Sequence, residues 1–456
     1  MRINTNIIAL TACHNLSIAD KDASSSIEKL SSGYKINSSK DNPVGAALSA
    51  KMKSQIRNLN KASQSTADGI SVIETAESVL AETQSMVQRM RELCVQAAND
   101  TYTDQDRVSI MAEIDQLRTE IDRVSEDTDF NTKKLLNGDL GRKSYTNIAG
   151  VDVSYVSTDV NAGEYEVHIL NQATQAQYTS GTVTGGVKGS VSINGVNVEI
   201  SEFDSADEIY EKIRDAADRS GITVTDNNGA YEYVSTRYGS KYGIEIKCDD
   251  ADMRASLGLS SSQTSAYGTD IEVSMVSSST SKFSPNSTAS CDGNKVVITD
   301  NNGFMIRIDV GENIEGDRII AHVTNIGSMT VQIGANEGQD IDIDIPRVNC
   351  EMMELDDILA YTSAGAEAAI TICDEAIEYI SEVRSRIGAY QNRMEHTQAS
   401  QDSTTENLTS ALSRMIDVDM AEEMTNYTTQ NVITQAATSM LAQANQLGDK
   451  VLQLLQ

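Results

Sequence analysis

The sequence predicts a mainly α-helical protein with an inserted α+β domain. Three observations support this class: helical apolar spacing towards both chain ends, short β-like runs between them, and few aromatic residues. Aromatic residues make up 4% of the 456 residues, and tryptophan is absent. Because globular cores usually fill volume with large rings, this composition favours long helices packed through smaller apolar side chains. The length allows several domains, since a single core stops growing near about 250 to 300 residues.

The two chain ends carry patterns that suit a helical pair. The last segment repeats apolar residues four and three apart, at Ile433, Ala437, Met440, Ala444, Leu447, Val451 and Leu454. The opening segment offers a mate through Ile3, Ile7, Leu10, Ile27, Leu30 and Tyr34. Alternating threes and fours form a coiled-coil seam. Because chain ends normally fray, we expect these ends to pair with each other as a terminal coiled coil.

The N-terminal arm continues with a predicted antiparallel pair of long helices. Residues 44–100 keep helical spacing, with an unbroken stripe from Val72 to Ala97. Turn residues at 99–103 come next, and a second stripe runs from Ile110 to Val124. A short turn between two such stripes favours an antiparallel bundle. Pro43 is expected at a hinge or at the start of the first helix.

The C-terminal arm is predicted to add another long helix. Its stripe runs from Ile380 to Val418 and contains no proline, but its middle is polar at Thr397, Gln401 and Thr404. Polar seam positions cost stability and restrict register, which suits a helix that must pack in one arrangement. A merely weak stretch of helix is the alternative interpretation.

Residues 141–328 switch to β-like runs and are predicted to form the α+β insert. These runs are Tyr165–Leu170, Val191–Val198, Gly243–Lys247 and Val296–Thr299. Residues 225–229 and 299–303 both read Thr-Asp-Asn-Asn-Gly and predict hairpin turns. The pattern of residues 205–219 predicts the one clear helix of this region. Residues 329–345 alternate between apolar and polar side chains, which predicts a further hairpin. The Ser/Thr-rich segments 260–265 and 277–284 are expected to be exposed loops.

Charge and cysteine usage exclude several classes of function. The formal net charge is −31, whereas nucleic-acid binding needs clustered Lys and Arg, so neither nucleic acid nor an anionic membrane is expected as a partner. No apolar run reaches membrane-spanning length, and the N-terminus lacks a secretory signal core. The six cysteines form no CxxC pair and the four histidines are dispersed. We therefore expect inert thiols and no metal site.

Several stretches match the signature of a known family. The N-terminal arm carries Met1–Asn6, Leu30–Asn37, Ala67–Ser71 and Ile121–Val124. The C-terminal arm carries Ser385–Ala389 and Leu441–Gln446. These stretches resemble bacterial flagellin over residues 1–140 and 329–456. The span 191–246 also resembles a small domain that recurs in flagellins and hook-associated proteins.

The resemblance implies a domain organisation. Residues 1–43 and 419–456 would form the terminal coiled coil that lines the inner tube of a filament. Residues 44–140 and 329–418 would form a helical bundle with a β-hairpin, as an outer tube. Residues 141–328 would be a variable, β-rich domain that projects outward.

The resemblance also implies the function and the partners. The chain would polymerise with itself into the flagellar filament for swimming motility, outside the cell. It would be exported by the flagellar type III route with an export chaperone, and would meet hook-associated junction and cap proteins. Neither a cofactor nor a catalytic residue is expected. The predicted assembly residues are Ile3, Ile7, Leu10, Leu30, Ile433, Met440, Leu447, Val451 and Leu454.

A second predicted site resembles the flagellin segment recognised by Toll-like receptor 5. It contains Gln88, Arg89 and Leu93, with Glu113 as the matching acid on the return helix. Arg89 and Leu93 lie one turn apart on a helix. Leu93 also falls on the helix seam, so core packing is the alternative interpretation for this residue.

Other functions find less support in the sequence. HExxH, GxSxG and P-loop motifs are absent from the sequence. Asp340, Asp342 and Asp344 alternate on a strand where a cation could sit, but a solvated hairpin face is the simpler interpretation. A hook–filament junction protein would share the helical ends, and an adhesin acting through the insert could be an added role.

Overall fold

A computed structural model describes most of the chain. The described residues are 6–157, 160–184, 187–227, 229–275, 282–284, 286–301, 304–311, 314, 318–324 and 327–454, with only the backbone described for 447–454. The chain forms two compact units. The first contains Met1–Asp68, Gln332–Asp340 and Met394–Gln456, and the second contains Gly69–Val331 and Ile341–Arg393. Ile3 and most of the predicted loop 277–284 lie outside the described residues.

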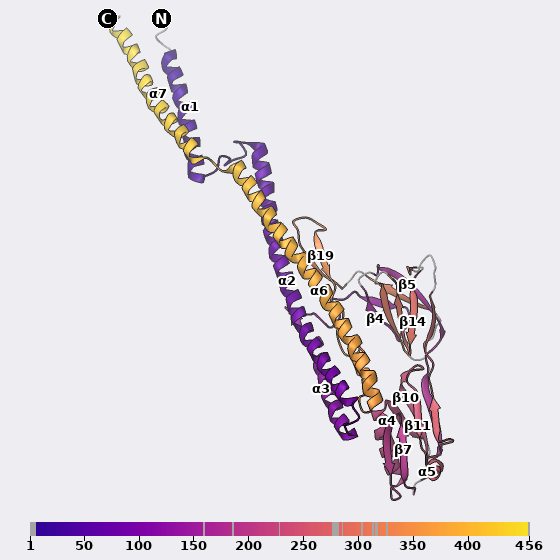
Figure 1. The fold of residues 1–456 in the computed structure, drawn as a ribbon. Coiled ribbons are helices and arrows are strands. Elements are labelled where there is room, and N and C mark those ends of the chain that lie inside the picture. Colours follow the sequence, from indigo (N-terminus) through magenta and orange to yellow (C-terminus); the bar gives the residue numbers. More distant parts are fainter. Residues whose placement is uncertain are drawn as a thin grey trace. The chain divides into compact units, whose positions relative to one another are not determined.

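The elements confirm the predicted class, with helical arms around a β-rich region (Figure 1). The helices are α1 (Ile7–Ser32), α2 (Pro43–Ala97), α3 (Asp104–Asp127), α4 (Ala206–Arg219), α5 (Ala251–Ser256), α6 (Ser363–Ile416) and α7 (Met420–Leu454), with a 3₁₀ turn at Leu355–Asp357. The first strands are β1 (Asp129–Phe130), β2 (Lys133–Lys134), β3 (Ser144–Thr146), β4 (Val151–Val156), β5 (Gly163–Asn171), β6 (Gln175–Thr182), β7 (Gly189–Ile193), β8 (Val196–Ile200), β9 (Ile222–Asn227) and β10 (Ala230–Tyr238). The remaining strands are β11 (Ile244–Lys247), β12 (Gln263–Ala266), β13 (Glu272–Met275), β14 (Thr288–Asp292), β15 (Lys295–Thr299), β16 (Met305–Val310), β17 (Arg318–Val323), β18 (Met329–Gln332) and β19 (Asp340–Ile343).

Local signals in the sequence explain where the helices begin and end. The Asn6 side chain caps α1 by accepting a hydrogen bond from the Ala9 amide at 3.1 Å. Helix α1 ends at Gly33, whose φ of 76° is a left-handed conformation that favours glycine. Pro43 is the first residue of α2, a position where its missing N–H costs nothing. Complete capping boxes start α3, through Thr103 and Asp106, and α4, through Ser205 and Glu208.

In the first unit, α1 and α7 pair in antiparallel fashion (Figure 1). The Asn6 side-chain amide donates to the Ala444 carbonyl at 2.9 Å at one end of the pair. The Lys29 ammonium lies 3.7 Å from the Glu423 carboxylate at the other end. The two connecting segments also lie together, because the Lys35 amide donates to the Ile416 carbonyl at 2.7 Å.

The predicted seam of this terminal pair is correct at Leu30, Ala437 and Ala444 but wrong at several of its large aliphatic residues. Ile7 and Leu10 are each 69% exposed, Met440 is 59% exposed and Ile433 is 44% exposed. The least exposed positions of α1 are instead Ala9, Ala12, Leu16, Ala19, Ala23, Ser26 and Leu30, and those of α7 are Glu423, Tyr427, Gln430, Thr434, Ala437, Leu441 and Ala444. Both rows keep the four-three spacing. Four alanines of α1 and two of α7 lie in these rows and allow a near approach of the two helices, together with the larger Leu16, Leu30, Tyr427 and Leu441. Ile7, Leu10, Ile433 and Met440 stay outside the seam.

The first unit also contains parts of α2 and α6, which run antiparallel. The Ser63 hydroxyl donates to Asp402 at 3.1 Å. Gln401 is 5% exposed, and its amide donates to the Ile333 carbonyl in the loop after β18. Of the three predicted polar seam residues, Gln401 is therefore the one that is buried and bonded, whereas Thr404 is exposed.

In the second unit, α2 and α3 form the predicted antiparallel pair, and α6 lies beside them (Figure 1). Ion pairs fix the α2–α6 register: Arg91 bonds Asp374 at 2.5 Å, and Arg384 bonds Glu77 at 2.7 Å. The buried residues of α3 are Arg107, Ile110, Met111, Ile114, Ile121 and Ser125. Leu117 and Val124 of the predicted stripe are half-buried.

The β-rich region contains two cores. Four-stranded sheets of order β13-β5-β17-β3 and β14-β15-β16-β4 adjoin through β3 with β4 and through β13 with β14. They enclose one core that includes Tyr165, Val167, Ile298 and Ile306. Between β5 and β13 the chain forms a second core, where α4 packs on sheets of order β12-β11-β7-β8 and β6-β10-β9.

The predicted β elements are confirmed, with three differences. The predicted run Val191–Val198 is interrupted by Asn194 and Gly195, which both have positive φ, so it forms the hairpin of β7 and β8. Strands β9 and β10 pair antiparallel, as do β15 and β16, as the predicted hairpins at 225–229 and 299–303 require; residues 228, 302 and 303 lie outside the described residues. Residues 263–265 of the predicted loop 260–265 belong to β12. Asp344 does not lie on a solvated face with its neighbours: it follows the end of β19 and is 6% exposed, while Asp340 and Asp342 are exposed.

Candidate functional site

The outward face of α1 is an apolar surface without cover in the first unit. Ile7, Leu10 and Ile18 lie roughly opposite the alanine-rich row that faces α7, and Ile18 is 45% exposed. Large apolar side chains left exposed on a regular helix mark an interaction surface. Leu30 is the one predicted assembly residue of α1 that lies in the seam itself, where it is half-buried.

The exposed apolar residues of α7 lie beside its seam. Ile433 and Met440 each precede a seam position by one residue, which is about 100° around the helix. Val432 is 60% exposed and points further away from α1. The side chains of Leu447, Val451 and Leu454 are outside the described part of α7, although their backbone continues the helix. The terminal pair therefore presents apolar surface on both helices.

The second candidate site lies on α2 and α3 in the second unit. The Arg89 guanidinium donates to Glu113 of α3, at 3.1 Å through Nε and 2.9 Å through an Nη atom. The other Nη atom of Arg89 donates to Glu92 at 3.2 Å. These carboxylates raise the pKa of Arg89, so it stays charged. The structure therefore brings together Arg89 and Glu113, which are far apart in sequence.

Leu93 differs from its predicted neighbours in this site. It is 2% exposed, which favours the core-packing interpretation over direct contact with a partner. Gln88 is exposed on the same face as Glu92. Val95 was not predicted, although it is 47% exposed at a helical spacing of seven from Gln88. The sequence did contain a signal for Val95, because this apolar residue does not fall on the buried stripe of α2.

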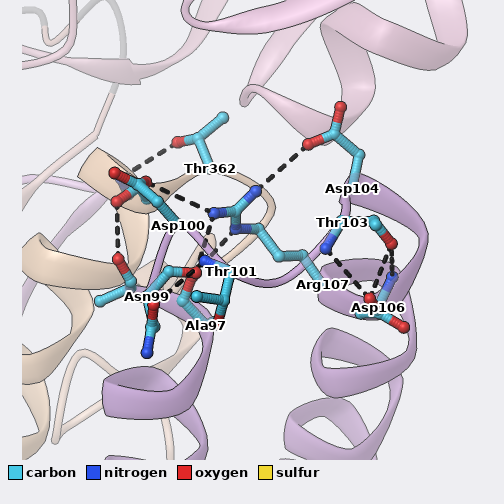
Figure 2. Close-up of polar contacts among 12 residues, drawn as sticks. Ala97, Asn99, Asp100, Thr101, Thr103, Asp104, Asp106, Arg107 and Thr362 are labelled. Carbon is cyan, nitrogen blue, oxygen red and sulfur yellow. Dashed lines mark hydrogen bonds and ion pairs between the residues drawn. The ribbon is translucent and has the colours of Figure 1, made fainter.

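A buried arginine holds the turn that brings α2 and α3 together (Figure 2). Arg107 is 7% exposed, and its Nε donates to the Ala97 carbonyl at 2.9 Å. One Nη atom donates to the Asn99 carbonyl at 3.3 Å, and the other donates to Asp104 at 3.3 Å. The last carbonyls of a helix have no partner within the helix. Arg107 supplies a charged donor there and thereby fixes the α2–α3 hairpin.

The start of α6 joins the same corner. The Ser363 hydroxyl donates to the Ala98 carbonyl at 2.7 Å. The Thr103 hydroxyl and the Asp106 carboxylate cap α3 reciprocally, and the bond from Thr103 lowers the pKa of Asp106 (Figure 2). Three helix ends are thus bonded at one corner of the second unit.

The described residues contain no group of three His, Cys, Asp or Glu side chains that could hold a metal ion. Burial raises the pKa of the Asp344 carboxyl, and the positive charge of Arg386 of α6 is the largest effect that opposes this rise. Arg386 donates to the Tyr155 hydroxyl at 3.1 Å, so these groups join β4 to α6. Their contacts are structural.

Comparison with known proteins identifies the family of the chain that carries these surfaces. Residues 3–140 match the bacterial flagellin N-terminal helical region, and residues 370–455 match the bacterial flagellin C-terminal helical region. A flagellin of Clostridium tyrobutyricum is 32% identical over 98% of this chain and 99% of its own length. The chain belongs to the bacterial flagellin family. It is also 30% identical to flagellin C of Vibrio cholerae, over 100% of this chain and 99% of that protein.

Solved structures similar to this flagellin come from the same apparatus. The flagellar hook-associated protein 3 of Legionella pneumophila covers 80% of this chain and 98% of its own, with 13% identity and a TM-score of 0.32. FliC of Burkholderia pseudomallei covers 71% of this chain and 99% of its own, with 16% identity and a TM-score of 0.25.

Family membership makes this flagellin a structural subunit of the flagellar filament. The recognised regions are the two helical arms, and the matched N-terminal region contains both α1 and the Arg89–Glu113 surface. No helix in the described part of the chain combines the length and the apolar character needed to cross a bilayer.

Proposed function

We propose that the filament assembles through the outward apolar faces of α1 and α7, each covered by helices of neighbouring copies. The observation that carries this proposal is the exposure of Ile7, Leu10, Ile433 and Met440 in the isolated chain. Each fully covered apolar side chain of this size contributes about 1.5 to 3 kcal/mol. Ile3, Leu30, Leu447, Val451 and Leu454 complete the proposed set of assembly residues.

The α1–α7 pair is suited to open and rearrange during assembly. Its seam contains alanines and polar residues such as Glu423 and Gln430 beside a few larger side chains, so it buries less apolar surface than a seam of large aliphatic residues would. Fixing the backbone of a disordered segment costs about 1 to 2 kcal/mol of conformational entropy per residue, which must be offset by burial of apolar surface. Neighbouring copies would supply that burial. This would keep monomers from associating before they reach the growing end.

We place this subunit outside the cell after export by the flagellar type III route. An export chaperone, the junction and cap proteins and further copies of the chain are its proposed partners. Its net charge of −31 would make assembly depend on salt, because like-charged subunits repel until screened. The boundaries 1–43 with 419–456, 44–140 with 329–418, and 141–328 are the proposed domains of the filament subunit.

Seeded polymerisation tests the assembly proposal. Purified chain would be added to short filament fragments at moderate salt, and the product examined by negative-stain electron microscopy. Long tubes are expected from the native chain, and soluble monomer from a chain lacking 433–456. Leu10→Asp is expected to block elongation, whereas Leu10→Met, which keeps an apolar side chain at the same position, should retain it. Normal filaments from both Leu10→Asp and the truncated chain would refute the proposal.

We also propose that Toll-like receptor 5 binds the exposed surface formed by Gln88, Arg89, Glu92 and Glu113. Arg89 is held by two carboxylates, so its guanidinium is oriented before a partner arrives. Side chains that are already ordered lose less entropy on binding, and arginine is enriched among interface anchors. Leu93 would support this surface from the core.

Binding of the full chain to the receptor ectodomain tests this second role. Arg89→Ala is expected to weaken binding at least about tenfold, as for an interface anchor. Arg91→Ala is the matched control, because it removes a neighbouring arginine that bonds Asp374 of α6 instead. Equal losses from both variants, or no binding of the native chain at micromolar concentration, would contradict the proposal.

A further inference from the structure

Two buried cysteines meet between α2 and α6 in the second unit. Cys94 and Cys373 are both 0% exposed, and each thiol is the main influence on the pKa of the other. They lie far apart in the sequence, so their contact depends on the packing of the two helices. The other cysteines have different surroundings: the thiol of Cys350 donates to the Arg118 carbonyl at 3.3 Å, and Cys13 is exposed.

The helices are held in register where the two thiols meet. Arg91 and Asp374 form an ion pair at 2.5 Å between α2 and α6, within one turn of Cys94 and next to Cys373. Around Cys373, α6 presents buried Ala369 and Ala376. Small side chains bring helix axes to the near end of their usual separation.

This packing suits the geometry of a disulfide. Packed helix axes lie about 8 to 10 Å apart, and the Cα atoms lie about 2.3 Å from each axis. Directly facing Cα atoms are therefore about 3.5 to 5.5 Å apart, which overlaps the range of about 4.4 to 6.8 Å found for disulfides. The Arg91–Asp374 ion pair places the two buried cysteines on neighbouring turns of α2 and α6, and the mutual effect of the thiols on their pKa values agrees with this proximity.

We propose that Cys94 and Cys373 are a disulfide-forming site that joins α2 to α6, with a small-molecule disulfide such as oxidised glutathione as the oxidant. One thiolate attacks oxidised glutathione and releases one glutathione thiol. The second thiolate then attacks the mixed disulfide and releases the other. Two S–H bonds and the glutathione S–S bond are broken, one protein S–S bond forms, and two protons and two electrons pass to glutathione.

The same burial keeps the site reduced while the helices stay closed. Cys94 and burial raise the pKa of the Cys373 thiol, whereas Cys373 lowers the pKa of the Cys94 thiol, so Cys94 is the first nucleophile. Both thiols are fully buried, and glutathione cannot reach them while the helices stay packed. Only the thiolate is the nucleophile in this exchange. Oxidation therefore requires local opening of α2 from α6, and the closed pair then determines which two sulfurs combine.

Refolding in a redox buffer tests this site. The full chain would be unfolded in urea, diluted into reduced and oxidised glutathione, alkylated and digested with trypsin. Cys94 lies in the tryptic peptide 92–107, and Cys373 lies in 348–384 together with Cys350. A Cys350→Ala background therefore makes the assignment unambiguous. The expected product is a dominant link between 92–107 and 348–384.

A thermal measurement supplies the second readout. The long loop closed by this link predicts a Tm that is higher without reductant than with it, by at least about 5 °C. Cys94→Ala should abolish both the linked peptide and this difference, while Cys248→Ala should keep them. Separate glutathione adducts on Cys94 and Cys373, a dominant link to another cysteine, or an unchanged Tm in the linked chain would overturn the proposal.

Discussion

Replacement of Arg107 is predicted to destabilise the α2–α3 hairpin strongly. Arg107→Met keeps the apolar stem but removes the donors to the Ala97 and Asn99 carbonyls. Hydrogen bonds that involve a charged group contribute about 1.5 to 3 kcal/mol each. In the variant, water can hydrogen-bond the Asn99 carbonyl, because the turn is exposed there, and this offsets part of the lost hydrogen-bond energy. We therefore expect a loss of about 3 kcal/mol in the free energy of unfolding.

Urea unfolding followed by circular dichroism at 222 nm measures this loss, because that signal reports mainly the helices. With an m value near about 3 kcal/mol/M, the helical transition should move down by about 1 M urea. Arg123→Met is the matched control on the same helix. Arg123 is exposed, and among the described residues it bonds Glu120 and Asp127, which are its own helical neighbours.

The control is expected to leave the midpoint unchanged, since exposed ion pairs within one helix contribute little. If Arg107→Met behaves like Arg123→Met, the buried arginine does not hold the hairpin and this reasoning is refuted. A loss confined to the amides of residues 98–103 in hydrogen exchange would instead mean that the turn opens without unfolding α2 and α3.

Three further predictions concern other buried or capping groups. Gln401→Leu should destabilise the loop after β18 by about 1 to 2 kcal/mol, seen as faster exchange of the Ile333 amide, whereas exposed Thr404→Leu should not. Ser205→Ala should cost α4 about 1 kcal/mol and speed exchange of the Glu208 amide, which donates to Ser205 at 3.3 Å; an unchanged rate would show that this cap is not formed. Burial raises the pKa of Asp344 above its ordinary 3.8, so its folded state is favoured at low pH and disfavoured as pH rises through the folded pKa. Asp344→Asn should therefore raise the Tm at pH 7 but not at pH 3, and equal shifts at both pH values would contradict this.

The helical arms could be predicted because their signals are local. Pro43, the capping boxes of α3 and α4, and Gly33 each act within a few residues, and the stripes of α2 and α6 are long enough to show their period. The hairpins of the insert follow from the repeated Asp-Asn-Asn-Gly turns for the same reason.

The register of the terminal pair could not be read from its largest apolar residues. Such reasoning assumes that one face of a helix is buried by one partner. Helix α1 has two apolar faces. One is rich in alanine and packs against α7, and the other points outward and carries Ile7 and Leu10. Which face pairs within the chain depends on side-chain size at the contact, which spacing alone does not specify.

Parts of the candidate receptor-binding surface could not be predicted from the sequence either. The contact of Arg89 with Glu113 depends on the length of the α2–α3 hairpin, which Arg107 fixes through carbonyls eight and ten residues before it. The burial of Asp344 depends on Arg386 and other groups distant in the chain. Non-local packing of this kind leaves no periodic signal.

We propose that the outward face of α1 becomes covered when copies of the chain assemble. Leu10→Cys in a Cys13→Ser background places one exposed thiol on that face, where its rate of maleimide modification can be measured in monomers and in seeded filaments. Our account predicts modification at least about tenfold slower in filaments, because the position passes from an exposed to a buried environment. Equal rates in filaments and monomers would contradict it.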